Sequence, residues 1–201
     1  MYIKELTNQL LSLKNNQRTK INIHFIVSEP LVTFCFDVNK EMEKCQRGFF
    51  NLGIESIVVP HITLYMGFVD NYDMLSIIFN VVGDYAKTLT PFKIDATNLY
   101  FKGFNKHSSQ YLFINLLQNE FLMEQKYKLD NLLKDKIYPI GWNMRDEASH
   151  ITVGCYENVS TKAFDIIDKY RILPSCKISQ IGVSIAGEKG VCLGLLKVFD
   201  L

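Results

Sequence analysis

The chain has 201 residues, of which 48% are hydrophobic and 21% charged, a composition typical of a globular protein with a substantial core. Its formal net charge of +1 argues against the extended basic surface that holds long duplex DNA or RNA. No apolar run is long enough to cross a membrane, and the N-terminal residues lack the apolar segment of a signal peptide. The five cysteines form no CxxC pair, which favours free thiols, so we expect a cytoplasmic protein.

The first half of the chain alternates between helical and strand patterns. Apolar residues at helical spacing predict helices, and apolar or alternating runs between turn residues predict strands. Helices are predicted over residues 2–15, 39–52 and 73–90, and strands over 21–27, 31–38, 55–66, 93–104 and 109–117.

The second half repeats this order. It predicts a helix that is capped by Asn119 and runs to about residue 136, followed by a loop over 138–149 and a strand over 149–156. A helix over 160–171 and strands over 177–186 and 191–199 complete the second half. The repeat predicts an α+β domain in which two antiparallel sheet lobes pack about a pseudo-twofold axis, with a central groove and helices outside. We expect residues 1–201 to form this single bilobal domain.

Two of the predicted strands carry the same short motif. His61-Ile-Thr63 and His150-Ile-Thr152 lie 89 positions apart, at matching places in the repeated pattern, and use two of the four histidines. Side chains alternate across a strand, so a His and a Thr two residues apart project from one face. If the equivalent strands of the two halves meet in the middle, two His and two Thr face one groove.

The segments P-H-I-T-L at residues 60–64, followed by Gly67, and S-H-I-T-V at 149–153 resemble the paired His-x-Thr/Ser motifs of the 2H phosphoesterase superfamily. Its LigT-like members are called 2′-5′ RNA ligases or RNA 2′,3′-cyclic phosphodiesterases. The resemblance covers nearly the whole chain in element order. It implies a duplicated LigT-like fold, with residues 1–20 as an N-terminal helical extension, and an enzyme without a metal or other cofactor.

The residue types suit cleavage of a phosphodiester. Histidine titrates near neutral pH, so His61 and His150 can act as general base and general acid on opposite sides of the phosphorus. Thr63 and Thr152 can each donate a hydrogen bond to a non-bridging oxygen, whose charge rises in the transition state. Which histidine is the acid stays open at this point.

A zinc site is the main alternative for the two histidines. Strand alternation puts Cys155 and Glu157 on the face opposite His150, so the sequence offers no third ligand and we expect no metal. His24 and His107 are interpreted as structural or surface residues.

Four further residues are candidate substrate contacts. By strand alternation Tyr65 and Tyr156 share the face of the motif histidines, where they could stack on a base. The loop before His150 resembles a lid and carries Trp142 and Arg145, whose guanidinium suits phosphate oxygens. An ordinary structural role is equally compatible with the two tyrosines, and a solvated loop charge with Arg145.

Two functions are compatible with the sequence. The first is a metal-independent phosphodiesterase acting on a 2′,3′-cyclic phosphate, a 2′-5′ linkage or a cyclic oligonucleotide. The second is a non-catalytic nucleotide- or RNA-binding module of the same fold. Two intact motifs favour the enzyme, because a binding module needs no pair of titrating groups. We expect a monomer that binds a small nucleotide, a cyclic nucleotide or a short RNA end, and neither a membrane nor long duplex DNA.

Overall fold

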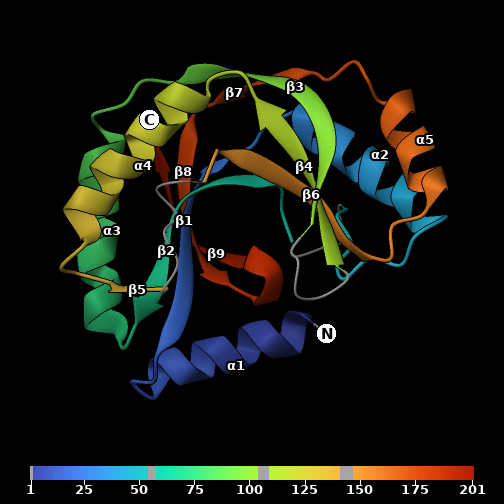
Figure 1. Cartoon of the computed structure of the whole chain (residues 1–201). Helices are drawn as coiled ribbons and strands as arrows, with labels where there is room; N and C mark the ends of the chain where they lie inside the picture. Colours follow the sequence, from blue (N-terminus) through green and yellow to red (C-terminus); the bar gives the residue numbers. More distant parts are fainter. Residues whose placement is uncertain (1, 54–57, 104–108, 141–146) are drawn as a thin grey trace.

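The computed structural model describes residues 2–53, 58–103, 109–140 and 147–201, and shows helices around a curled sheet (Figure 1). The helices are α1 (Tyr2–Lys14), α2 (Leu31–Glu43), α3 (Tyr72–Ala86), α4 (Asn119–Leu133), α5 (Thr161–Lys169) and the short 3-10 turn η2 (Glu188–Gly190). The strands are β1 (Thr19–Ile26), β2 (His61–Val69), β3 (Phe92–Gly103), β4 (Ser109–Leu116), β5 (Tyr138–Pro139), β6 (His150–Glu157), β7 (Ser175–Ile178), β8 (Gln180–Ala186) and β9 (Cys192–Asp200). Within the described ranges, no helix is long and apolar enough to span a membrane.

The strands form one antiparallel sheet in the order β7-β3-β4-β6-β2-β1-β8-β9, and β5 pairs with β2. We name β2, β1, β8 and β9 the first lobe, and β6, β4, β3 and β7 the second lobe. The lobes meet where β2 pairs with β6, through the backbone contact of Ile62 with Ile151. Equivalent strands of the two halves therefore meet in the middle, and the predicted α+β fold with two antiparallel lobes is confirmed.

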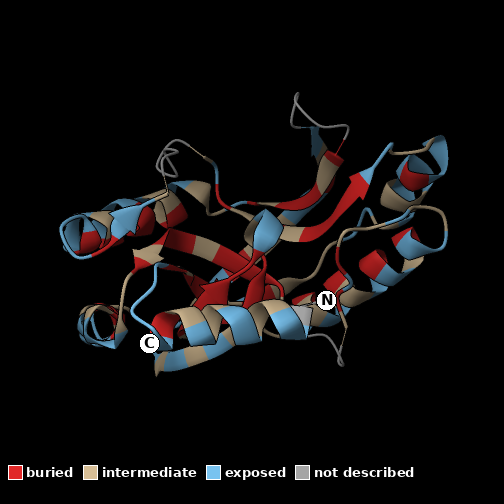
Figure 2. Cartoon of the chain, turned by 90° about the horizontal axis from the view of Figure 1, so that it is seen from below, coloured by how far each residue is buried: buried red, intermediate tan, exposed pale blue. Residues whose placement is uncertain are grey.

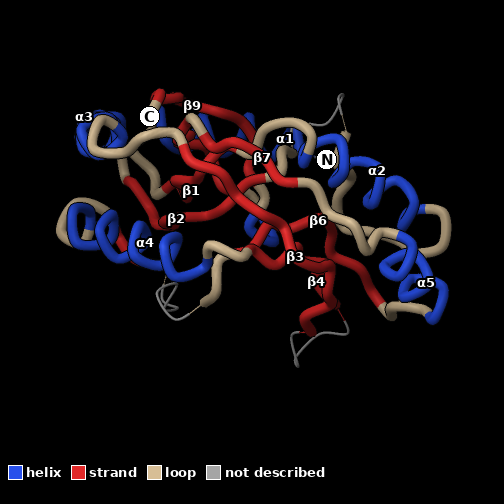
Figure 3. Tube along the Cα trace, turned by 90° about the horizontal axis from the view of Figure 1, so that it is seen from above, coloured by secondary structure: helices blue, strands red, loops and turns tan. Residues whose placement is uncertain are grey.

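Each lobe takes strands from both halves of the chain. The β8–β9 hairpin, from the second half, pairs with β1 in the first lobe, and the β3–β4 hairpin, from the first half, pairs with β6. The helices cross over in the same way, because α4 packs against α3 and β2 while α2 packs against α5 and β6. Figures 1 and 3 show these two helix pairs on opposite sides of the strands. The two halves are therefore interlocked.

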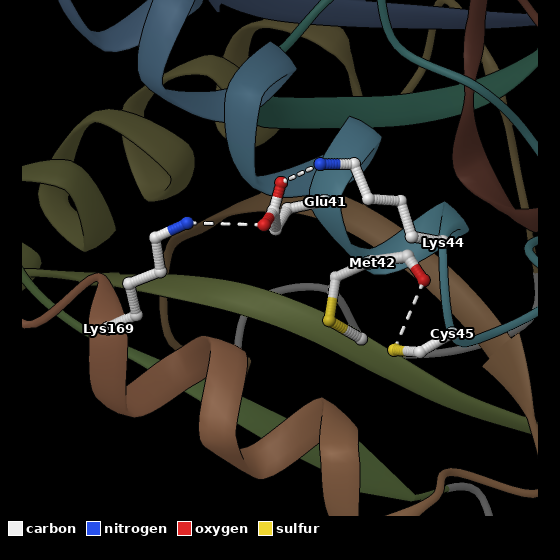
Figure 4. Close-up of polar contacts among 5 residues, drawn as sticks. All are labelled: Glu41, Met42, Lys44, Cys45 and Lys169. Carbon is white, nitrogen blue, oxygen red and sulfur yellow. Dashed lines mark hydrogen bonds and ion pairs between the residues drawn. The ribbon is translucent and has the colours of Figure 1, made fainter.

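Surface ion pairs also connect α2 to α5 (Figure 4). The carboxylate of Glu41 accepts hydrogen bonds from Lys169 Nζ at 3.1 Å and from Lys44 Nζ at 2.5 Å. Exposed pairs of this kind contribute about 0–1 kcal/mol each. Burial of apolar side chains of α2, such as Val38 and Met42, contributes about 1.5–3 kcal/mol per side chain and is the larger effect.

The buried residues are concentrated in the strands and on the inward faces of the helices (Figure 2). The predicted apolar face of α3 is confirmed, because its buried residues recur at helical spacing: Leu75, Ile78, Val82 and Tyr85. Asn71 caps this helix by accepting a hydrogen bond from the backbone N–H of Met74 at 2.9 Å. The helix ends at Ala86, so the predicted extension toward residue 90 is wrong.

The predicted N-terminal helix is confirmed as α1, which packs against β1 and β9. Leu13 on its inner face is fully buried. The carboxylate of Glu5 accepts a hydrogen bond from the backbone N–H of Glu188 at 3.0 Å. Helix α1 therefore supports η2, the turn between β8 and β9.

The strand predicted over residues 31–38 is wrong, because these residues form the first two turns of α2. Their aromatic and β-branched side chains favour a strand locally. The buried residues of α2 nevertheless lie at helical spacing: Leu31, Cys35, Val38, Asn39 and Met42. Packing of this face against β6 and α5 overrides the local propensity. The helix predicted over 39–52 consequently begins earlier and ends at Glu43.

Three other predicted features differ from the structure. The first motif strand begins at His61, so the prediction that residues 58–60 belong to it is wrong, while the predicted start at residue 55 lies outside the described residues. The strand predicted over 177–186 is divided at Ser179, because β7 pairs with β3 in the second lobe while β8 pairs with β1 in the first. Asn119 does not cap α4, since its side chain instead accepts a hydrogen bond from the backbone N–H of Ser149 at 2.8 Å.

Both motif strands contain a β-bulge directly after the threonine. In the β1–β2 pair His24 lies opposite Thr63 and Ile23 opposite Tyr65, which leaves Leu64 as the extra residue. In the β4–β6 pair the register shifts in the same way, and Val153 is the extra residue. Because each bulge inserts one residue, the side chains that follow it in the motif strand point to the opposite face of the sheet from the one that strict alternation predicts.

Asn39 of α2 holds the bulge of β6 in place. Its amide donates a hydrogen bond to the carbonyl of the bulged Val153 at 2.9 Å, and its Oδ1 accepts one from the backbone N–H of Leu52 at 2.9 Å. Asn39 is fully buried, so no water can replace these bonds.

We predict that Asn39→Leu lowers the free energy of unfolding by about 2–4 kcal/mol, because it leaves buried backbone groups without partners. Urea unfolding of the wild type and the variant measures the difference. Substitution of the exposed neighbour, Lys40→Ala, is the control and should change stability by no more than about 0.5 kcal/mol. A loss below about 1 kcal/mol in Asn39→Leu would contradict this role.

Candidate active site

A cavity of about 320 Å³ is lined by residues of both motifs, His61 and Thr63 from β2 and His150 and Thr152 from β6. The pairing of Ile62 with Ile151 brings these strands together, and the motif residues on either side of each isoleucine face the cavity. The remaining lining residues come from β1, β2, β4, α4, the segment before β6, and η2: Lys20, Met66, Tyr111, Phe113, Lys126, Glu147, Lys189 and Gly190.

The ring of His61 is held by hydrogen bonds at both nitrogens. Nδ1 lies 2.9 Å from the carbonyl oxygen of Val59, so this nitrogen carries the proton and donates it. Nε2 then accepts a hydrogen bond from the amide of Asn22 at 3.2 Å, and the same amide donates to Thr63 Oγ1 at 3.2 Å. Burial lowers the pKa of His61, because a charged imidazole loses hydration there. His61 is therefore neutral in the free protein near pH 7.

His150 has an equivalent setting in the second lobe. Its Nδ1 donates to the carbonyl oxygen of Ala148 at 3.0 Å, again the residue two positions earlier. The ring stacks on Phe113, with centroids 3.8 Å apart and planes 24° from parallel. The pKa of His150 is lowered to about 4, and burial is the main cause. The positive charges of Lys126 and Lys102 contribute to this lowering, while the hydrogen bond to Ala148 and the charge of Glu147 oppose it.

Asn22 distinguishes the two histidines. It lies on β1 and bonds to His61 and Thr63, whereas no equivalent amide contacts His150 among the hydrogen bonds of the described residues. Asn22 Oδ1 is buried and has no hydrogen-bond partner within the described part of the chain. Asn22 was not predicted from the sequence as a site residue. Strand alternation in β1 puts Asn22 and His24 on one face, and both alternate with buried isoleucines along the strand. Polar residues at such positions of an apolar strand are the sequence pattern that could have identified Asn22.

His24 is fully buried behind His61. The two rings are 5.1 Å apart in an edge-to-face arrangement, and Nδ1 of His24 lies 3.2 Å from Ser184 Oγ. Burial is the main cause that lowers the pKa of His24 well below its usual value, and the nearby His61 lowers it further. His24 does not line the cavity, which agrees with its interpretation as a structural residue.

The predicted placement of Tyr65 and Tyr156 in the groove is wrong, because both follow the bulges. Tyr65 is 8% exposed and Tyr156 is fully buried, and both belong to the hydrophobic core. The hydroxyl of Tyr156 accepts a hydrogen bond from Asn39 Nδ2 at 3.2 Å. After the bulge in β2 the cavity is lined by Met66 instead of Tyr65.

Aromatic residues on β4 line the cavity in place of these tyrosines. Phe113 supports the ring of His150, and Tyr111 lies next to Phe113 with ring centroids 5.5 Å apart. Both project toward the cavity because they are two residues apart on one strand. The sequence marked β4 as a strand, but not that this face would meet the motifs.

The candidate residues Trp142 and Arg145 lie outside the described residues, as does His107. The bulge in β6 also changes the expected position of Cys155, which lies opposite Tyr111 in the β4–β6 pair and is therefore on the cavity side of the strand. No group of three or more His, Cys, Asp and Glu side chains in the described ranges could hold a metal ion.

Comparison with known proteins identifies the fold. No protein-family model and no curated sequence matches the chain. The structure resembles apo LigT of E. coli with a TM-score of 0.60 and 12% identity, over 92% of this chain and 98% of LigT. It also resembles TT0787 of Thermus thermophilus (TM-score 0.60, 13% identity, 90% and 97% covered) and Usb1 of Kluyveromyces marxianus (0.52, 11%, 91% and 98%). At these identities the likeness shows the fold, and the LigT-like fold implied by the motifs is confirmed.

The buried histidines predict acid sensitivity. The unfolded chain takes up a proton at His150 near pH 6.5, whereas the folded protein does so only near pH 4, so stability falls as the pH drops through this window. We expect the stability that the wild type loses between pH 7.5 and pH 5 to be reduced by about 1–2 kcal/mol in His150→Gln, which cannot titrate. Denaturant unfolding of both proteins at the two pH values measures this, and equal losses would contradict it.

Proposed function

We propose that this chain is a metal-independent phosphodiesterase of the 2H phosphoesterase superfamily that acts on a small nucleotide. The observation that supports this most directly is the cavity shared by His61, Thr63, His150 and Thr152. Each histidine donates Nδ1–H to the carbonyl two residues earlier, which leaves Nε2 as the nitrogen that can accept or deliver a proton. General acid–base catalysis at one phosphorus atom requires two imidazoles that are each oriented in this way.

In the proposed reaction one histidine takes the proton of the attacking water or hydroxyl, and the other gives a proton to the leaving oxygen. The bond from phosphorus to the leaving oxygen breaks as the bond to the nucleophile forms. Thr63 and Thr152 donate hydrogen bonds to the two non-bridging oxygens as their negative charge increases. The anionic phosphate raises the pKa of the neighbouring imidazole. That imidazole is therefore protonated when substrate is bound, although the free protein favours its neutral form.

The difference between the two settings favours His150 as the base. Its neutral form is favoured by burial and by the charges of Lys126 and Lys102, and no amide occupies its Nε2 among the described contacts. His61 is then the acid. Rotation of the Asn22 amide would turn its unpartnered Oδ1 toward a protonated His61 and let it accept the Nε2–H bond.

A nucleotide substrate is supported by the cavity and by the structural neighbours. LigT of E. coli has been solved with 3′-AMP, and Usb1 of K. marxianus with uridine monophosphate. In this chain Tyr111 and Phe113 offer an aromatic surface beside His150, on which a base could stack. We infer that the substrate carries a 2′,3′-cyclic phosphate, a 2′-5′ linkage or a cyclic oligonucleotide phosphodiester.

The alternative is a nucleotide- or RNA-binding module of the same fold without turnover. Recognition of a phosphate needs donors and positive charge, but not two neutral imidazoles whose Nδ1–H groups are both held by backbone carbonyls. The paired histidine settings therefore favour the enzyme over the binding module.

We predict that His61→Ala and His150→Ala each lower kcat/KM by about 10²–10⁴-fold, because each removes a proton-transfer group. Thr63→Val and Thr152→Val should lower it roughly tenfold or more through loss of a donor. The assay offers 2′,3′-cyclic, 2′-5′-linked and cyclic dinucleotide substrates in the presence of EDTA, followed by product separation. Thr97→Val, on the exposed part of β3, is the matched control and should retain activity.

The outcomes separate the candidate functions. EDTA-resistant turnover that both histidine variants lose supports the phosphodiesterase. Binding of these ligands without turnover of any of them supports the binding module. Turnover that EDTA abolishes, or that survives in a single histidine variant at full rate, contradicts the proposed mechanism.

A further inference from the structure

The cavity carries more positive charge than one phosphodiester needs. Three lysines line it, Lys20, Lys126 and Lys189, against a single acidic residue, Glu147, whereas the formal net charge of the whole chain is +1. The carboxylate of Glu147 is itself paired with Lys102 Nζ at 3.0 Å. Within the described part of the chain, none of the three lining lysines has a carboxylate within 4.0 Å. The excess positive charge is thus left for a ligand.

Lys126 is the most unusual of the three. It is only 4% exposed and lies on the buried face of α4, between Leu122 and Leu129, which are both fully buried. Its Nζ donates a hydrogen bond to the carbonyl oxygen of Glu147 at 2.9 Å. A buried ammonium group with no carboxylate in direct contact is costly, and burial lowers the pKa of Lys126 to about 8, although the negative charge of Glu147 opposes this shift. An apolar residue would serve α4 better if Lys126 had only to support packing.

The His-x-Thr motifs do not account for Lys126. The two threonines and two histidines already supply donors for the oxygens of one phosphate, and they lie on the paired strands β2 and β6. Lys126 reaches the cavity from α4, a helix that packs against β2. Lys20 reaches it from β1, which pairs with the edge of β2 opposite β6. Lys189 extends from the turn η2, where its Nζ lies 4.7 Å from the ring centroid of Phe49. The positive charge therefore surrounds the motifs.

We propose that Lys126 forms a subsite for a second phosphate group, so that the ligand of this cavity carries at least two phosphates. This inference rests on the proposed function, because the first phosphate is the one that the two motifs hold. Lys20 and Lys189 add long-range attraction for such a multiply charged ligand. The substrate class is then an oligonucleotide with a second phosphodiester, or a nucleotide with an additional terminal phosphate.

The test compares two ligands that differ by one phosphate, adenosine 3′-monophosphate and adenosine 3′,5′-bisphosphate. Their dissociation constants are measured by titration calorimetry for the wild type, Lys126→Met and Lys128→Met. Lys128 lies half a turn away on α4, is exposed, and pairs with Glu124 at 2.7 Å, so it is the matched control. A charge-assisted hydrogen bond supports a preference for the bisphosphate of about tenfold or more.

We expect this preference in the wild type and in Lys128→Met, and a preference below about twofold in Lys126→Met. Equal binding of both ligands by the wild type would overturn the subsite. So would an equal loss for both ligands in Lys126→Met, because Lys126 would then serve the first phosphate or the fold. Thermal unfolding checks that Lys126→Met is folded, and Lys126→Gln replaces it if it is not.

Turnover of a 2′-5′-linked diadenosine, with and without a 5′-phosphate, is measured separately. A bisphosphate preference without turnover leaves the subsite intact and refutes the proposed function. Turnover of both substrates at the same kcat/KM, together with equal binding of the two nucleotides, refutes the subsite and leaves the function intact.

Discussion

The structure depends on one short contact, the antiparallel pairing of Ile62 with Ile151. It is the only register position at which β2 and β6 pair within the described residues, and both side chains are fully buried. The residues on either side of each isoleucine are the motif histidine and threonine, so this contact sets how close the two motifs come. Because helices α2 and α4 each pack against the motif strand of the other half, the contact is reinforced from both sides.

The two β-bulges keep the space beside the motif histidines open as a cavity. Strict alternation would continue each motif strand with a tyrosine on the groove side, and two large rings would fill the space beside the histidines. The extra residues Leu64 and Val153 turn Tyr65 and Tyr156 into the core instead. The cavity is left with a methionine on one side and the aromatic face of β4 on the other. A matching irregularity at the same motif position in both halves is also the most detailed sign of the duplication.

The sequence predicted the parts of the molecule that local periodicity controls. The buried stripe of α3, the strand pair β3–β4 and the two motifs follow directly from residue spacing. The first two turns of α2 were predicted wrongly, because their local propensity favours a strand while packing stabilises the helix. The bulges could not be predicted, since they depend on the partner strand and on a buried amide from a distant helix. In the sequence, Lys126 was recognisable only as a charged residue on an apolar helix face. Its role could be inferred only from the structure, which shows that it lines the cavity.

The exchange of hairpins between the lobes has a consequence for synthesis of the protein. Strand β1 is the first strand of the sheet to leave the ribosome, yet one of its edges pairs with β8, which follows six other described strands in the chain. Until then β1 exposes unpaired backbone groups along an apolar strand, the kind of edge that recruits other chains. Neither half can close its own sheet, so the growing polypeptide must extend through β8 before β1 is protected.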